Sequence, residues 1–162
     1  REVKLEEGES TWWPEFYVAS SLGAIISWYP SSLLPVSLSS GLMYTRLDGT
    51  SKTDSMHQNA GYLGIPLRVN YSFLNKDRMN LSASAGGRLD YCINIPDHAE
   101  INKIQSSAYV GLSADYMFSK NIGLRFGLGS DIYFVGRDKE KSPFQKTTPV
   151  GSASAAILIA LP

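Results

Sequence analysis

The two histidines are the residues whose neighbours most resemble a hydrolytic site. Asp54 and Ser55 precede His57, and two acidic residues flank His98. A serine–histidine–acid site needs a defined mutual geometry, which neighbouring positions in a sequence do not supply. Histidines in long polar loops are usually solvated. We therefore predict that the protein is not an enzyme and has no catalytic residues.

Metal and cofactor sites are not predicted either. The histidines lie in separate polar segments, without the ligand spacing of a metal site. Cys92, the single cysteine, shares a polar face with Asp90 and has no nearby base, and it excludes a disulfide framework within the chain. Gly127 and Gly129 alternate within one segment that no helix follows, so they do not form a phosphate-binding loop. We expect no metal and no cofactor.

A balanced set of arginines and carboxylates is the remaining candidate site. Its members are Glu15, Arg68, Arg88, Asp90, Asp115, Arg125 and Asp131. Buried charges must be paired and hydrogen-bonded, and the planar guanidinium of arginine can bind a carboxylate through two hydrogen bonds. We interpret the set as a structural charge cluster inside a narrow lumen. A proton or small-ion path, or a ligand-sensing core, is the alternative.

Strict alternation of apolar and polar residues is the pattern that would position these charges. In LRFGLGSDIYF, residues 124–134, every second residue is apolar or small, which is the period of a β-strand. Seven such segments are predicted as strands: 15–29, 35–47, 61–73, 79–93, 106–118, 122–135 and 149–161. They exceed the usual strand of about 5–6 residues and suit a tilted membrane span of roughly 9–11 residues plus rims.

Length and composition limit the protein class. The 162 residues suit one domain, with 1–14 as a loop or N-terminal extension and 15–161 as the barrel strands. The formal net charge is zero, so no general electrostatic attraction to nucleic acid is expected. No apolar run approaches the roughly 20 residues of a membrane helix.

The connections between the segments alternate in length. PSSLL, LNKDR and SKN are short, whereas DGTSKTDSMHQNA, NIPDHAEINKIQ and GRDKEKSPFQKTT are long. Outer-membrane barrels combine short periplasmic turns with long extracellular loops, and closed bacterial barrels have even strand numbers. We therefore expect an eight-stranded antiparallel up-and-down transmembrane barrel whose first strand lies upstream of Arg1. The alternative is a short closing strand at 2–12.

The composition of the two faces favours a lumen over a solvated sheet. Every lysine lies outside the predicted strands, and the polar faces carry Gly, Ser, Asn and the balanced charges. Aromatic residues gather at strand ends, as in the girdles of membrane barrels. These are Trp28, Tyr29, Tyr44, Tyr71, Phe73, Tyr91, Tyr116, Phe118 and Phe134. The polar face is therefore predicted to point inward.

Three stretches resemble a known family. LPVSLSSGLMYTRL, YLGIPLRVNYSF and LSASAGGRLDYC are similar to the small outer-membrane barrels of the Bacteroidota, the OmpA-like and PorT-like families. These families show Gly-Leu-x-Tyr followed, after a long loop, by Tyr-Leu-x-Ile-Pro-Leu. The matching residues here are Gly41, Leu42, Tyr44, Tyr62, Leu63, Ile65, Pro66 and Leu67. Pro66 lacks a backbone donor, so we expect it at a β-bulge.

The resemblance covers most of 15–161 and implies a location in the bacterial outer membrane. Some barrels of this kind resemble the C-terminal parts of dual-membrane proteins with a cytoplasmic anti-sigma region, which implies a role in envelope signalling. An eight-stranded barrel is just wide enough for side chains to fill, so we expect no open pore. The expected partners are outer-membrane lipid and a periplasmic or extracellular protein, with the barrel as a monomer.

Two other functions remain open from the sequence. The three long loops could bind an extracellular ligand or act in adhesion, because loops on rigid scaffolds often carry function. A soluble calycin-like barrel for an apolar ligand would instead place the Leu, Ile, Val and Phe face inside. The preferred hypothesis is a side-chain-filled outer-membrane barrel that acts as a membrane anchor or an envelope-sensing module.

Overall fold

The computed structural model describes residues 16–30, 34–50, 57–94, 103–134 and 149–161. Within these ranges the chain forms seven β-strands, as the alternation predicts. They are β1 (Phe16–Trp28), β2 (Val36–Thr50), β3 (His57–Lys76), β4 (Met79–Asn94), β5 (Ile104–Met117), β6 (Ile122–Tyr133) and β7 (Pro149–Leu161). Glu15, predicted as the first residue of a strand, lies outside the described residues, as does His98.

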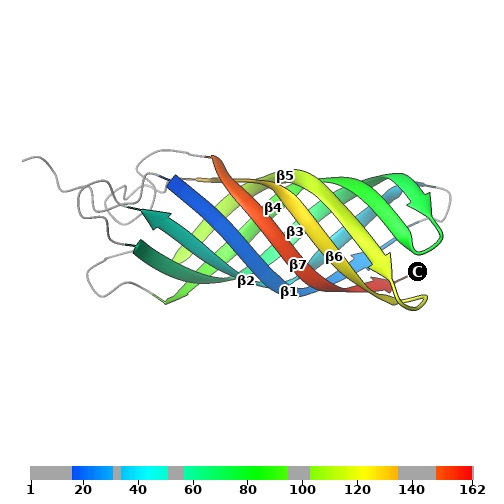
Figure 1. Ribbon diagram of the computed structural model, residues 1–162, viewed down its shortest axis with the longest axis horizontal. Helices are drawn as coiled ribbons and strands as arrows, with labels where there is room; N and C mark the ends of the chain where they lie inside the picture. Colours follow the sequence, from blue (N-terminus) through cyan, green and yellow to red (C-terminus); the bar gives the residue numbers. More distant parts are fainter. Residues whose placement is uncertain (1–15, 31–33, 51–56, 95–102, 135–148, 162) are drawn as a thin grey trace, which may run out of the picture.

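The strands close into a single barrel in sequence order, tilted relative to its long axis (Figure 1). Each strand pairs antiparallel with the next along the chain, and β1 closes the barrel by pairing with β7 in parallel. The coarse prediction of an all-β, mostly antiparallel closed barrel is therefore confirmed, with seven strands among the described residues. No helix in these ranges is long and apolar enough to span a membrane.

The predicted alternation of short and long connections holds only in part. At one end of the barrel, called here the short-turn end, the connections after β1, β3 and β5 span seven, two and four residues, and at the other end those after β2, β4 and β6 span six, nine and fifteen. At the short-turn end, β3 and β4 are joined by Asp77 and Arg78 alone, and Asp77 has a positive φ of 48°. Aspartate tolerates this left-handed conformation better than most residues. Because β3 extends to Lys76, one lysine does lie within a strand, contrary to the sequence prediction, although only as its last residue.

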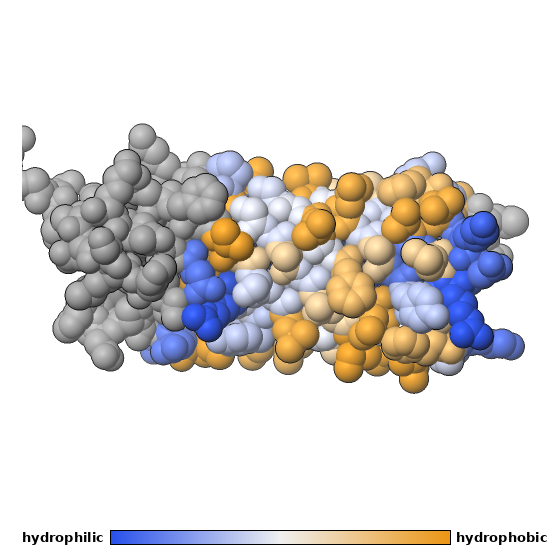
Figure 2. Space-filling model, in the orientation of Figure 1, coloured by the Kyte–Doolittle hydropathy of each residue, from blue (hydrophilic) through white to orange (hydrophobic). Residues whose placement is uncertain are grey.

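The outer surface of the barrel is apolar and the inner surface is largely polar. Leu67, Leu112 and Leu128 are 64%, 59% and 70% exposed, whereas Arg68 and Asp131 are 5% and 0% exposed. Figure 2 shows hydrophobic side chains spread along the barrel, with hydrophilic residues at both ends of the coloured surface. The strand alternation therefore points the polar residues inward, as predicted.

Two apolar clusters inside the barrel were not predicted. One lies near the start of β7 and contains Ala19, Leu47, Tyr62, Cys92, Tyr133 and Val150. The other lies closer to the short turns and contains Ile25, Met43, Ala156 and Leu158. The inward faces of β1, β2 and β7 carry no charge among the residues whose burial is described, so the charged side chains gather against the opposite wall.

The β-bulge expected at Pro66 does not occur. Pro66 keeps its place in the register opposite Arg88 on β4, and the register with β2 is the same before and after it. The β2–β3 ladder is instead interrupted at Pro66, and Ser40 Oγ donates a hydrogen bond of 2.8 Å to the Pro66 carbonyl. Pro66 therefore removes a hydrogen bond from the ladder but adds no extra residue to the strand. The register shifts between β3 and β4 lie between Gly61 and Tyr62 and between Ser72 and Leu74.

Candidate functional site

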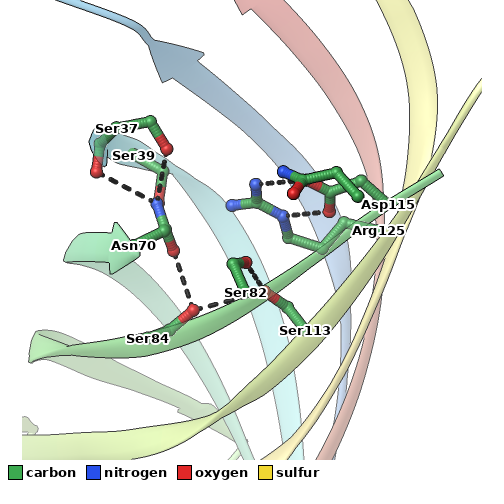
Figure 3. A network of polar contacts seen from close by, with 9 residues as sticks. Ser37, Ser39, Asn70, Ser82, Ser84, Ser113, Asp115 and Arg125 are labelled. Carbon is green, nitrogen blue, oxygen red and sulfur yellow. Dashed lines mark hydrogen bonds and ion pairs between the residues drawn. The ribbon is translucent and has the colours of Figure 1, made fainter. Parts of the chain in front are cut away.

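The best-formed ion pair of the lumen joins two neighbouring strands. Asp115 on β5 and Arg125 on β6 are register partners, and both are almost fully buried. Arg125 donates from Nε to Asp115 Oδ1 at 2.6 Å and from Nη2 to Oδ2 at 2.8 Å. Asn80, the register partner of Asp115 on β4, adds a longer contact of 3.4 Å from Nδ2 (Figure 3). This layer ties three strands together across the lumen wall.

A second charged group lies farther from the short turns. Arg88 Nε donates to Asp90 Oδ2 at 2.8 Å, and its Nη1 lies 3.9 Å from Asp131 Oδ1. The Arg88 Nη2 atom also donates to the Tyr133 hydroxyl. Gly64 makes room for this group, because a Cβ at that position would collide with the Asp90 carboxylate. One arginine therefore bridges carboxylates from β4 and β6.

An arginine stacked on a tyrosine fills the space between the two groups. The Arg68 guanidinium lies 3.8 Å from the centroid of the Tyr109 ring, a cation–π arrangement. The ring lies against inward-facing glycines, since a Cβ at Gly129 would come within 2.7 Å of the ring and one at Gly111 would collide with its hydroxyl. The described residues provide Arg68 with no carboxylate at ion-pair distance.

A network of neutral polar side chains crosses the same part of the lumen. Asn70 Nδ2 donates to Ser39 Oγ at 3.0 Å and to Ser37 Oγ at 3.2 Å. Asn70 Oδ1 accepts from Ser84 Oγ at 2.8 Å, and Ser84 lies 3.2 Å from Ser113 Oγ (Figure 3). From the sequence alone, these serines were predicted only as part of the polar strand faces. The recurrence of serine at inward strand positions was the sequence signal for a network that links β2 to β5.

The structure thus places six of the seven predicted charge-cluster residues inside the barrel. Glu15 lies outside the described residues. The six form two ion-paired groups and one stacked arginine rather than a single cluster, and they carry three positive and three negative formal charges. No protein group hydrogen-bonds either carboxylate oxygen of Asp131 within the described ranges. The buried charges of the described residues therefore balance in number, although Arg68 and Asp131 are less well paired than the others.

Most residues considered for other chemistry lie outside the described residues, among them Asp54, Ser55 and His98. Cys92 is a buried free thiol, 3.5 Å from the Asn94 carbonyl. His57 begins β3, and the segment with Asp54 and Ser55 lies outside the described residues. Within the described ranges, no group of three or more histidine, cysteine, aspartate or glutamate residues could hold a metal ion.

A cavity of about 500 Å³ opens at the short-turn mouth of the lumen. Its lining includes Tyr29, Asn75, Asn80, Asp115, Lys120 and Asn121. Burial raises the pKa of the Tyr29 phenol, and the negative charge of Asp115 raises it further. The phenol therefore stays protonated near neutral pH, and the Ser37 and Asn80 side chains lie within hydrogen-bonding reach of it. The cavity could not be predicted from the sequence, because its lining residues come from several strands and turns.

The geometry defines a closed β-barrel with an apolar exterior and an interior that holds buried charges, neutral polar side chains and two apolar clusters. No protein-family model matches the sequence, and neither the curated proteins nor the solved structures gave a match. The resemblance to outer-membrane barrels of the Bacteroidota therefore stays a prediction.

Proposed function

We propose that this chain is a small outer-membrane β-barrel, with its lumen closed by side chains, that serves as a membrane anchor or envelope-sensing module. The observation that carries the proposal is the reversed polarity of the barrel. Charged side chains such as Arg88 and Asp131 are buried, while large apolar side chains cover the outside. A soluble calycin-like barrel requires the opposite arrangement.

The extent of the exposed apolar surface supports a lipid environment. Soluble monomers rarely expose contiguous apolar patches larger than a few hundred Å², whereas here every strand presents outward Leu, Ile, Val or aromatic side chains. Trp28, Phe73 and Phe118 are 47%, 55% and 55% exposed near the short turns, and Tyr91 and Phe134 are exposed nearer the other end. This spacing suits the two aromatic girdles of outer-membrane barrels, with the short turns on the periplasmic side.

The filled lumen supports a role other than transport. The Arg68–Tyr109 stack and the ion pairs on either side of it occupy the interior, and their charges balance. A barrel closed in this way can anchor attached segments at the membrane or respond to changes in the cell envelope. The more specific hypothesis of an anti-sigma signalling protein rests on the resemblance alone.

We also propose that the membrane-embedded barrel has an eighth strand between β1 and β7. The support is the parallel β1–β7 seam, since an odd number of up-and-down strands forces one parallel pairing. A strand inserted there would run antiparallel to both neighbours. It would end where β1 begins, so it would precede β1 in the chain, as the loop pattern predicts.

The membrane proposal is tested by heat-modifiable gel mobility of the full chain, including any upstream segment. The purified protein in detergent is run boiled and unboiled, and detergent is then withdrawn. We expect a faster unboiled band and precipitation on detergent removal. A monomer that stays dispersed in plain buffer, without a band shift, would contradict a membrane barrel.

The eighth strand is tested by cysteine cross-linking in a Cys92→Ser background. Leu22 and Ala155 are partners across the parallel seam, and Leu22 and Tyr44 are partners across β1–β2. An intervening strand would separate the first pair by about 9–10 Å, twice the interstrand spacing, which is too far for a disulfide. We expect the Leu22→Cys/Tyr44→Cys protein to cross-link and the Leu22→Cys/Ala155→Cys protein not to. Equal cross-linking of both pairs would establish seven strands.

A further inference from the structure

The short-turn end has a groove between two neighbouring turns, in addition to the cavity at the mouth of the lumen. This inter-turn groove has a volume of about 410 Å³. Its lining comes from the β3–β4 and β5–β6 turns and the end of β5, and consists of Asp77, Arg78, Met117, Phe118, Ser119 and Lys120. None of these residues belongs to β1 or β7, so an eighth strand at that seam would not enter the groove.

Backbone hydrogen bonds hold the two turns in place. Met117 N donates to the Arg78 carbonyl at 2.8 Å, which extends the β4–β5 ladder as far as the turn. Phe118 N and Ser119 N both donate to the Ile122 carbonyl, at 2.9 and 3.1 Å. The Ser119 hydroxyl oxygen accepts from Ile122 N at 3.1 Å, which leaves the hydroxyl hydrogen free to donate. The groove is therefore formed before a ligand arrives, which lowers the entropic cost of binding.

The groove carries an excess of positive charge. Arg78 and Lys120 are exposed, and within the described residues neither has a carboxylate at ion-pair distance. Asp77 also lines the groove, so two basic residues face one acidic residue. Arginine binds a phosphate through two hydrogen bonds, and lysine attracts it as a compact charge. A phosphate group is therefore the ligand chemistry that these two residues suit.

The groove continues into the exposed aromatic surface of the barrel. Phe118 lines the groove and packs edge to face against Tyr116, with ring centroids 5.5 Å apart and ring planes at 73°. Met79, the register partner of Tyr116 on β4, is also exposed. A ligand that uses both surfaces has a negatively charged head and apolar chains. A free phosphate or a soluble acidic molecule would use only the charged part.

We propose that the inter-turn groove binds the headgroup of an anionic phospholipid, with its phosphate on Arg78 and Lys120 and its acyl chains along Tyr116 and Phe118. The Ser119 hydroxyl is placed to donate a hydrogen bond to the same phosphate. The inference rests on the proposed function, because a bilayer lipid reaches the groove only if the barrel lies in a membrane. It adds to that function the class of lipid that the short-turn end selects.

The test is native mass spectrometry of the full chain, including any upstream segment, in a non-ionic detergent. The probes are phosphatidylglycerol and phosphatidylcholine with the same acyl chains, which are anionic and zwitterionic at neutral pH. We expect phosphatidylglycerol to bind at least about fivefold more tightly, since one basic residue near an anionic surface contributes about this factor. Equal binding of the two lipids would overturn the proposal.

A competitor distinguishes a lipid from a free phosphate. Glycerol phosphate carries the anionic group without acyl chains, so at a concentration equal to that of the lipid it should leave phosphatidylglycerol bound. Displacement of the lipid under these conditions would show that the groove recognises a soluble phosphate, and the lipid proposal would fail.

Three variants and a matched control locate the site. Arg78→Gln and Lys120→Gln should each weaken phosphatidylglycerol binding about fivefold. Asp77→Asn should strengthen it by a similar factor, and asparagine tolerates the φ of 48° that Asp77 adopts. Lys76→Gln, at the same end but outside the groove lining, should change binding less than about twofold. Equal losses for Lys76→Gln and Arg78→Gln would show that diffuse surface charge, rather than the groove, attracts the lipid.

The outcomes separate this inference from the proposed function. A sample with a heat-modifiable band that binds both lipids equally contradicts the lipid site alone, whereas a sample without the band shift contradicts the membrane barrel. The gain expected for Asp77→Asn cannot arise from a damaged barrel. An Asp77→Asn protein that binds phosphatidylglycerol no better than the parent would therefore count against the groove even if a glutamine variant failed to fold.

Discussion

Removal of one partner of the Asp115–Arg125 pair should destabilise the barrel far more than removal of both. Arg125→Met leaves the Asp115 carboxylate buried, with only the 3.4 Å contact from Asn80. An uncompensated buried charge typically costs about 3–5 kcal/mol. We expect the lower end of that range, about 3 kcal/mol, because the neighbouring lumen side chains are polar.

The double variant Asp115→Leu/Arg125→Met tests the reasoning directly. It removes both charges and keeps similar side-chain volume, so its free energy of unfolding should lie within about 1 kcal/mol of the parent. The exposed Arg46–Asp48 pair is the control. Its side chains are 51% and 47% exposed, and Arg46→Met should cost no more than about 1 kcal/mol.

The assay is urea unfolding in lipid vesicles, followed by the fraction of the compact band on an unboiled gel. Four proteins are compared under one set of conditions: the parent, the two single variants and the double variant. A cost for Arg125→Met no larger than that for Arg46→Met would refute the claim that this pair is desolvated. A double variant as unstable as Arg125→Met would show that packing, rather than charge, sets the cost.

Three further predictions concern the wall and filling of the barrel. Gly129→Val should lower the free energy of unfolding by about 1–3 kcal/mol, because the valine side chain would collide with Tyr109. Gly151→Ala is the control, since a Cβ there meets nothing within 4 Å, and its free energy of unfolding should stay within about 0.5 kcal/mol of the parent in the same urea assay. Leu112→Arg on the outer face should cost about 2–4 kcal/mol in vesicles if the barrel spans the membrane; a change below about 0.5 kcal/mol would favour an aqueous surface. Tyr109→Ala should produce current steps in planar bilayers where the parent shows none, and open channels in the parent would contradict a closed lumen.

The face that each residue occupies could be predicted from the sequence because it depends on local geometry. Successive side chains of a strand point to opposite sides, so Arg125 and Asp131 are inward wherever β6 pairs. Connection length was a weaker guide, because β2 and β3 extend into the predicted long loop and leave six residues between them. In β2 and β7, small and polar residues such as Ser40 and Ser154 occur on both faces, so the inward positions of Met43 and Leu158 were missed.

The partners of each charge were decided by the tertiary structure. The balance of arginines and carboxylates was visible in the sequence, but a match in number does not state which arginine meets which carboxylate. Arg125 reaches Asp115 because β5 and β6 pair in that register. Arg68 instead stacks on Tyr109, two strands away, over a surface of glycines. Such contacts depend on interstrand register, which alternation restricts without specifying.

The sequence by itself determined that the chain forms long amphipathic strands with polar inner faces, since a period of two is a property of consecutive residues. Only the tertiary structure decided how the barrel closes, through a parallel β1–β7 seam, and how its interior fills. Closure of the barrel and packing of its interior depend on contacts between residues far apart in the chain. Their free energies depend on interstrand register, barrel tilt and close approach across the lumen.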